Sequence, residues 1–226
     1  MTQANEAERN MIQEFMAMER MRKIECFRQL NRHALPGQIV MAGSSLMEGF
    51  PVNELMGSFW VPGVVYNRGI GGITSDVLIE ALDPCILDLK PSRLFINIGT
   101  NDLAQPGFTL QRLEENYRLI LGRVRSALPD CRICLMAYYP MNELDRFNGI
   151  ENNMMQASRS NRLLDACNGM IERMAMDLGH IYLDLNAPLR DERGQLKAEF
   201  TVEGVHLYPN AYVEVFKGLV PYLAQS

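Results

Sequence analysis

The amino-acid sequence predicts an α/β fold, a doubly wound parallel sheet of five strands that lies between two layers of helices. Five short apolar runs alternate with segments of helical period, which is the pattern of a parallel sheet covered on both faces. Right-handed crossovers between successive strands then place helices on both sides of the sheet. The chain has 226 residues, a length that a single α/β domain commonly reaches.

The elements follow from these runs in chain order. The predicted strands are Gln38–Ala42, Val64–Asn67, Arg93–Ile98, Arg132–Ala137 and His180–Asp184. The predicted helices are Ser75–Leu89, Leu110–Ala127, Ser158–Leu178 and about Asn210 to Leu223. Ahead of the sheet, a segment over residues 6–31 carries apolar residues loosely at helical spacing. We therefore expect one domain over residues 1–226, with residues 6–31 as a helical extension packed on it.

Composition excludes several classes of protein. The 22 basic and 27 acidic residues give a net charge of −5, without the dense basic patch that binds nucleic acid. No apolar run approaches the about 18 residues of a membrane-spanning helix. The N-terminus lacks the basic-then-apolar pattern of a secretion signal. The five cysteines are scattered and odd in number, which is typical of free thiols in a reducing compartment. We expect a cytoplasmic protein.

Cys131 and Cys134 form a C-x-x-C pair inside a predicted strand. On a strand, residues three apart point to opposite faces of the sheet. That geometry suits neither a redox pair nor a metal clip, and no second pair completes a zinc site. We expect both thiols to be structural.

Ligands of a doubly wound sheet bind beyond the carboxyl ends of its strands. Three loops there have unusual sequences, GSSLMEG, RGIGGITS and GTNDLAQ. In the first loop Ser45 is a candidate nucleophile, and Gly43 allows a tight turn before it. The alternative for Ser45 is a helix N-cap, a role that serine commonly fills. The loop differs from the G-x-S-x-G elbow of α/β-hydrolases, because Met47 replaces the second glycine.

Further candidate residues lie in later loops. Glu203 and His206 are spaced by three, so the carboxylate can orient the imidazole as the acid of a serine triad does. The alternative for His206 is an ordinary polar loop residue. The backbone near Gly72 and the amide of Asn101 are candidate oxyanion donors, which acyl transfer requires. The glycine cluster is also consistent with a turn or a phosphate cradle, although the third glycine of G-x-G-x-x-G is missing.

Taken together, these loops resemble the SGNH (GDSL) hydrolases. The resemblance rests on four blocks in the family's order, Gly43-Ser44-Ser45-Leu46, Asn67–Gly72, Gly99-Thr100-Asn101-Asp102 and Glu203-Gly204-Val205-His206-Leu207. The strings NRGIGG and GQLKAEFTVEGVHLYPNAY are similar to those of small bacterial proteins that resemble platelet-activating-factor acetylhydrolase subunits. The resemblance implies a flavodoxin-like three-layer sandwich and a carboxylic ester hydrolase that needs neither metal nor cofactor.

The resemblance also implies a role for each matched residue. Ser45 is the expected nucleophile, His206 its general base, and Glu203 the residue that orients His206. The backbone N–H groups of Ser45 and Gly72 and the Asn101 side chain form the expected oxyanion hole. Family precedent favours short acyl groups, acetyl above all. The expected partner is a small-molecule ester.

Two residues depart from the family pattern. Ser44 and Glu203 both stand where the family usually has Asp, and the longer Glu203 either reaches His206 or leaves it loosely held. These departures motivate an alternative, a non-catalytic ligand-binding module on the same fold. A third hypothesis is a flavodoxin-like nucleotide or FMN binder whose glycine-rich loop holds phosphate. That hypothesis gives His206 no task.

Three further features carry weaker expectations. Met11, Met16, Met18 and Met21 lie along the first predicted helix and favour packing or subunit contact over a metal site, so a homodimer is among our expectations. The polar segment Tyr138–Asn153 is expected to form either a rim or lid beside the site or a plain surface loop. Trp60 is expected to pack against the protein.

Overall fold

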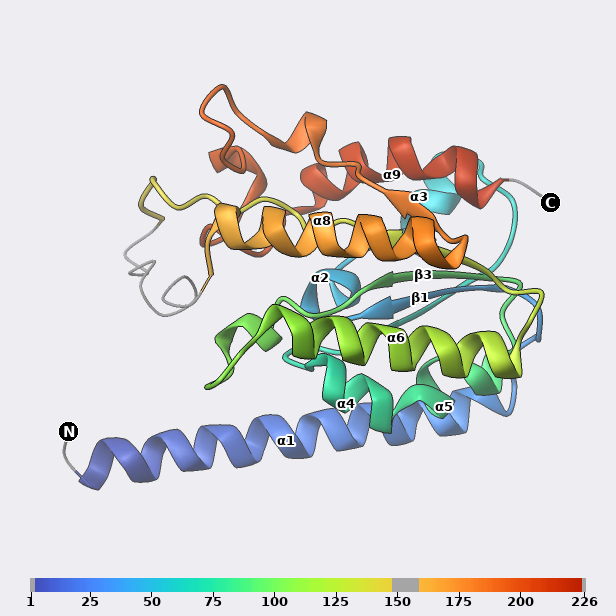
Figure 1. Cartoon of the computed structure of the whole chain (residues 1–226), viewed down its shortest axis with the longest axis horizontal. Helices are drawn as coiled ribbons and strands as arrows, with labels where there is room; N and C mark the ends of the chain where they lie inside the picture. The colour runs from blue at the N-terminus through green and yellow to red at the C-terminus, as the bar shows by residue number, and fades with distance from the viewer. Residues whose placement is uncertain (1–2, 148–158, 225–226) are drawn as a thin grey trace.

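A computed structural model describes residues 3–147 and 159–224 of the chain (Figure 1). Within these residues, five strands form one sheet in the order β2-β1-β3-β4-β5. Their bounds are β1 Ile39–Gly43, β2 Val65–Gly69, β3 Arg93–Asn97, β4 Arg132–Met136 and β5 Ile181–Leu183. Every neighbouring pair is parallel, and each strand overlaps the run predicted for it. The predicted α/β class with a five-stranded parallel sheet is confirmed.

Helices cover both faces of this sheet (Figure 1). Their bounds are α1 Gln3–Asn31, α2 Ser45–Glu48, α3 Val52–Ser58, α4 Ser75–Glu80, α5 Leu82–Cys85, α6 Leu110–Ala127, α8 Asn161–Leu178 and α9 Pro209–Leu223. Short 3₁₀ turns lie at Leu87–Leu89, Asp102–Ala104, Ala187–Leu189 and Ala198–Phe200. Among the helices of the described residues, none is both long and apolar enough to cross a membrane.

The alternation of residues along each strand creates two hydrophobic cores. On β1, Val40 packs into the core beneath α4, α5, α6 and α8, whereas Met41 packs into the core beneath α2, α3 and α9. The same alternation separates Cys131, just before β4, from Cys134 on that strand. Burial raises the pKa of the Cys131 thiol to about 12 and that of Cys134 to about 11. Both are free thiols, as predicted from the alternation of side chains between the two faces of the sheet.

The predicted helix Ser75–Leu89 is wrong as a single element. The chain breaks at Ala81 into α4 and α5, and a 3₁₀ turn follows. Pro84 has no N–H to donate to the carbonyl of Glu80, so an unbroken helix would lose that hydrogen bond and clash with the proline ring.

Helix α1 runs along the outside of the sheet layers, and its N-terminal turns extend beyond the strands (Figure 1). Its C-terminal half is anchored by Phe27, which is 6% exposed and lies under the guanidinium of Arg68 at 4.7 Å. Arg68 also donates to Asn31 at 2.9 Å. Further out, the methionine side chains at 11, 18 and 21 are exposed. A homodimer through this surface stays a prediction.

Trp60 contradicts the expectation that it packs. It follows the last turn of α3 with a φ of 54°, a left-handed conformation that often ends a helix. The side chain is 91% exposed. Its neighbour Phe59 contacts the protein instead, with its ring centroid 5.3 Å from that of Phe216.

We expect Gly43→Ala to lower the free energy of unfolding by about 1–3 kcal/mol, the usual cost of overpacking a core. A Cβ at Gly43 would lie 2.1 Å from the carbonyl oxygen of Asn97 on β3. Urea denaturation followed by circular dichroism measures this change. Gly122→Ala is the matched control, because Gly122 lies inside α6 with nothing within 4 Å of its added Cβ. That variant should gain about 0.5–1 kcal/mol. Equal stability of Gly43→Ala and wild type would contradict the packing argument.

Candidate active site

Ser45 is the first residue of α2, and only Ser44 separates it from the end of β1 at Gly43. The close approach of Gly43 to the Asn97 carbonyl leaves no room for a side chain at the end of β1. Ser44 occupies the N-cap position with its hydroxyl buried and without a hydrogen-bond partner among the described residues. The N-cap alternative for Ser45 is therefore wrong, and its Oγ lies at the surface of a cavity.

The α2 turn is held against the neighbouring strand β2. The Asn67 side chain donates to the carbonyls of Met47 at 2.7 Å and Phe50 at 3.1 Å, and accepts from the backbone N–H of Gly69 at 2.9 Å. Gly69 lies so close to α2 that a Cβ there would be 2.1 Å from the backbone nitrogen of Glu48. These contacts fix the helix that presents Ser45.

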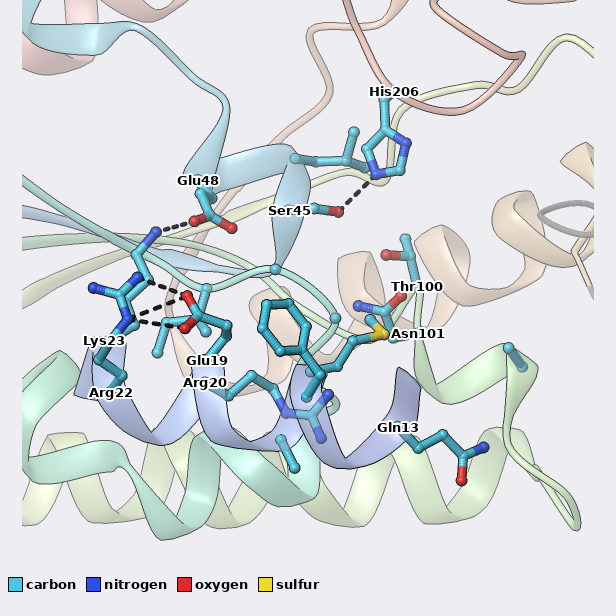
Figure 2. Close-up of a pocket in the computed structure, with 18 of the residues that line it drawn as sticks. Gln13, Glu19, Arg20, Arg22, Lys23, Ser45, Glu48, Thr100, Asn101 and His206 are labelled. Carbon is cyan, nitrogen blue, oxygen red and sulfur yellow. Dashed lines mark hydrogen bonds and ion pairs between the residues drawn. The ribbon is translucent and has the colours of Figure 1, made fainter. Parts of the chain in front are cut away.

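Ser45, His206 and Glu203 form one hydrogen-bonded chain. The Ser45 Oγ lies 3.0 Å from Nε2 of His206 (Figure 2). The other ring nitrogen, Nδ1, lies 2.5 Å from Oε1 of Glu203. The same carboxylate oxygen accepts the backbone N–H of His206 at 3.0 Å. The longer acid therefore reaches the ring, and this geometry lets the imidazole accept a proton from the hydroxyl.

The turn that carries Glu203 and His206 is closed by Thr201. The Thr201 hydroxyl donates to the carbonyl of His206 at 2.8 Å and accepts the N–H of Gly204 at 2.8 Å. Gly204 has a φ of 94°, which favours glycine. These local contacts bring Glu203 and His206 together within one turn.

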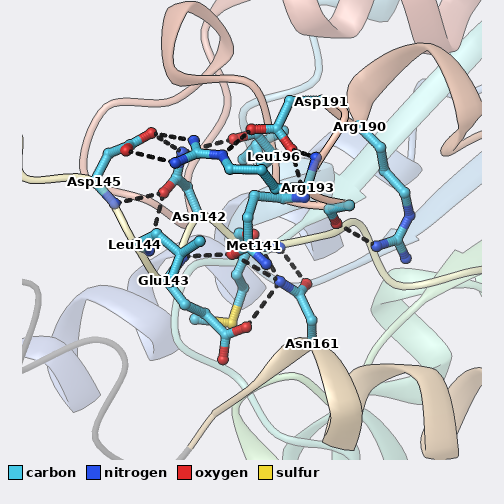
Figure 3. A network of polar contacts seen from close by, with 12 residues as sticks. Met141, Asn142, Glu143, Leu144, Asp145, Asn161, Arg190, Asp191, Arg193 and Leu196 are labelled. Carbon is cyan, nitrogen blue, oxygen red and sulfur yellow. Dashed lines mark hydrogen bonds and ion pairs between the residues drawn. The ribbon is translucent and has the colours of Figure 1, made fainter.

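Residues 141–145 connect this turn to a polar network with the loop over residues 190–196, and Figure 3 shows that network. The backbone N–H of Asn142 donates to the Gly204 carbonyl at 2.8 Å, and its side chain donates to Leu196 O at 2.8 Å. Arg193 pairs with both Asp145 and Asp191 at 2.9 Å. The first part of the predicted rim Tyr138–Asn153 therefore braces the site, whereas its residues from 148 on lie outside the described residues.

The charge of Glu203 is favoured although its side chain is only 9% exposed. Burial pushes its pKa upward. Hydrogen bonds from the side chain and backbone of His206, and the charges of His206 and Arg159, outweigh this effect and hold the pKa below its ordinary value. The carboxylate is thus ionised at neutral pH and able to stabilise a positive imidazolium beside it.

Three residues that line the cavity, Ser45, Gly72 and Asn101, each provide a hydrogen-bond donor. The backbone N–H groups of Ser45 and Gly72 donate to no other group in the described part of the chain, and Gly72 has a φ of 73°. The Nδ2 of Asn101 donates to the carbonyl of Ile73 at 2.9 Å. An amide nitrogen carries two hydrogens, so Asn101 keeps a second donor.

The orientation of the Asn101 amide is set by Arg159, which the sequence analysis did not single out. Arg159 donates from Nη2 to Oδ1 of Asn101 at 2.8 Å and from Nε to the carbonyl of Thr100 at 2.9 Å. Because Oδ1 of Asn101 accepts from Arg159, the Nδ2 of the same amide points away from Arg159, toward the carbonyl of Ile73. No local pattern marks Arg159, since it precedes α8 in an otherwise polar segment.

Asp102 has a structural position. Its carboxylate accepts the backbone N–H of Ser75 at 3.0 Å and also the Ser75 hydroxyl. It therefore braces the start of α4. Burial raises its pKa, against the effect of the hydrogen bonds from Ser75.

A cavity of about 1240 Å³ joins these groups. Ser45, Gly72, Asn101 and His206 line it from the sheet edge, and α1 forms its facing wall (Figure 2). The predicted extension over residues 6–31 thus contributes directly to the candidate site. Helical periodicity indicated the helix but not the cavity on which it lies.

Comparisons with known proteins identify the family of the chain. The family model of GDSL-like lipases/acylhydrolases matches residues 43–213. This stretch contains all four sequence blocks. A comparison with curated proteins finds no match.

Solved structures share the fold over nearly the whole chain. A Streptococcus pneumonia protein, provisionally named a platelet activating factor, is 26% identical with a TM-score of 0.87, covering 98% of this chain and 100% of its own. A GDSL-like lipase from Bacteroides thetaiotaomicron is 18% identical with a TM-score of 0.69, covering 88% of this chain and 97% of its own. An acetylxylan esterase from Geobacillus stearothermophilus, solved as a catalytic mutant, is 16% identical with a TM-score of 0.64, covering 85% and 96%. The chain belongs to the GDSL-like lipase/acylhydrolase family and is a carboxylic ester hydrolase.

Proposed function

We propose that this enzyme hydrolyses short-chain esters, acetyl esters above all, through an acyl-enzyme on Ser45. The observation that carries the proposal is the chain of hydrogen bonds from Ser45 through His206 to Glu203 at the wall of a large cavity. Ser45 and His206 match the family's motifs, and Glu203 supplies the carboxylate where the family usually has Asp. Among the structural neighbours, an acetylxylan esterase supports acetyl as the acyl group.

The reaction proceeds in two halves. Ser45 Oγ attacks the ester carbonyl while Nε2 of His206 takes its proton, and a tetrahedral oxyanion forms. The N–H groups of Ser45 and Gly72 and the second hydrogen of Asn101 donate to that oxyanion. The imidazolium then protonates the departing alcohol, which leaves the acyl group on Ser45. Water, deprotonated by His206, attacks the acyl-enzyme, and the acid is released as the proton returns to Ser45.

We place the reaction in the cytoplasm. All five cysteines are free, and four of them are buried. Free thiols persist where the compartment is reducing.

The first prediction concerns the nucleophile. A fluorophosphonate probe should add to Ser45, because the probe reacts with a serine that a base activates and whose oxyanion is bound. Mass spectrometry of the modified peptide locates the adduct. Ser45→Ala should lose the adduct and about 10⁴-fold or more in kcat on an acetyl ester.

Ser44→Ala is the matched control for this experiment, since it removes a neighbouring hydroxyl that has no hydrogen-bond partner among the described residues. The control should label as wild type does. A folded wild-type protein that takes no adduct would instead favour a silent binding module on the same fold.

The second prediction concerns the Asn101 donor and its orientation. Asn101→Ala should lower kcat by about 10²–10³-fold, the usual worth of one oxyanion donor. Arg159→Met should lower kcat about tenfold in the wild-type background and much less in the Asn101→Ala background, because contacting residues couple. Steady-state kinetics of the four proteins measure this coupling. Equal losses in both backgrounds would mean that Arg159 does not act through Asn101.

The third prediction concerns the acid. Glu203→Gln keeps the size of the side chain but removes the charge, so kcat should fall by up to about 10⁴-fold. In Glu203→Asp, whose side chain is one methylene shorter but keeps its charge, kcat should fall less than in Glu203→Gln. The pKa of Glu203 is lowered in the folded protein. Its carboxylate is therefore charged at any pH above the ordinary pKa of glutamate, and the charge is lost only as the pH falls through the lowered pKa. Kinetics at about pH 8, where Glu203 is ionised and histidine side chains are ordinarily neutral, therefore isolate the effect of the charge. A Glu203→Gln variant as active as wild type at this pH would contradict the assignment.

A further inference from the structure

Arg20 lies on the α1 wall of the cavity, beside the candidate oxyanion hole. Its Nη1 is 3.6 Å from the position that a Cβ on Gly72 would take. The side chain is half-buried and borders the same cavity as Ser45. Figure 2 shows Arg20 on α1, on the far side of the cavity from His206. A fixed positive charge therefore stands within the space that a substrate fills.

The other cations of this wall are neutralised, whereas Arg20 is not. Arg22 donates to both carboxylate oxygens of Glu19, at distances down to 2.6 Å. Lys23 pairs with Glu48 on α2. Arg20 makes no hydrogen bond or ion pair with any residue in 10–147 or 159–224, and Figure 2 draws no contact from it.

The surroundings of Arg20 strengthen its pull on an anion. Met16, one turn earlier on α1, has its Cε 3.4 Å from the same Cβ position on Gly72. Phe15 also borders the cavity. A guanidinium beside apolar side chains and partly withdrawn from water binds an anion more strongly than an exposed one does. Its planar fork matches the two oxygens of a carboxylate or phosphate group.

We propose that Arg20 forms an anion subsite and that the natural ester carries a carboxylate or phosphate group in its alcohol part. This inference rests on the proposed function. An acetyl group occupies a small fraction of a cavity of about 1240 Å³, so the remaining space along α1 receives the alcohol. The apolar side chains of Phe15 and Met16 contact its hydrocarbon portion, and Arg20 binds its charge.

The test uses pairs of aryl acetates that differ in charge at one position. The anionic substrates are 4-acetoxybenzoate and 4-acetoxyphenyl phosphate, and the neutral reference is 4-acetoxybenzamide. For each protein, the ratio of kcat/KM between an anionic ester and the amide cancels effects common to both substrates. The two anions separate a carboxylate preference from a phosphate preference.

We expect Arg20→Met to lower this ratio by about tenfold to a hundredfold for at least one anion, because it removes hydrogen bonds to a charged group. The change should lie mainly in KM, and Arg20→Lys should recover part of it. Arg28→Met is the matched control, since Arg28 lies on the same helix, pairs with Glu25 and is away from the cavity. It should keep the wild-type ratio.

An unchanged ratio in Arg20→Met, or the same fall in Arg28→Met, would overturn the subsite while leaving ester hydrolysis intact. A wild-type protein that hydrolyses none of the esters and takes no fluorophosphonate adduct would instead contradict the proposed function. The subsite is then decided by titration calorimetry of 4-hydroxybenzoate against 4-hydroxybenzamide. Preference for the anion must be present in wild type and lost in Arg20→Met for the subsite to stand.

Discussion

The contact between Gly43 on β1 and the Asn97 carbonyl on β3 is the constraint on which the site depends. A side chain at Gly43 would push the two central strands apart or move the turn that follows. Without one, α2 starts at once and Ser45 stands at the carboxyl edge of the sheet. The turn of His206 comes to the same edge, held by backbone and side-chain hydrogen bonds. The distance of 3.0 Å between Ser45 Oγ and His206 Nε2, in residues 161 positions apart, thus depends on strand packing and on these hydrogen bonds.

Much of this arrangement could be predicted, because parallel strands bring their carboxyl ends to one edge. The five strands follow from local apolar runs, and the resemblance to a family named Ser45, Asn101 and His206 in their loops. Spacing alone left Glu203 undecided between reaching the imidazole and leaving it loose. The outcome depends on Thr201 and Gly204, which shape the turn so that one carboxylate oxygen meets both the ring and the backbone of His206.

Other features depend on contacts that no local pattern encodes. Arg159 reaches Asn101 across 58 residues of sequence, and α1 reaches Gly72 from before the first strand. Trp60 is exposed because its left-handed backbone after α3 directs the side chain into solvent, although a large apolar side chain favours burial. The break at Ala81 is different in kind. The proline that causes it is visible in the sequence, and the periodicity of the segment outweighed it in the prediction.

The two walls of the cavity are held by different kinds of interaction. The sheet-edge wall, with Ser45 and His206, is fixed by buried hydrogen bonds and by glycines with no room for a Cβ, so its geometry tolerates little change. The α1 wall is anchored mainly near Phe27, whereas Phe15 and Met16, which also face the cavity, are exposed. Substitutions at these exposed positions of α1 therefore cost little stability. Under the proposed mechanism, the core constrains the reacting groups, whereas the proposed subsite for the alcohol lies on a helix outside the core and is free to change.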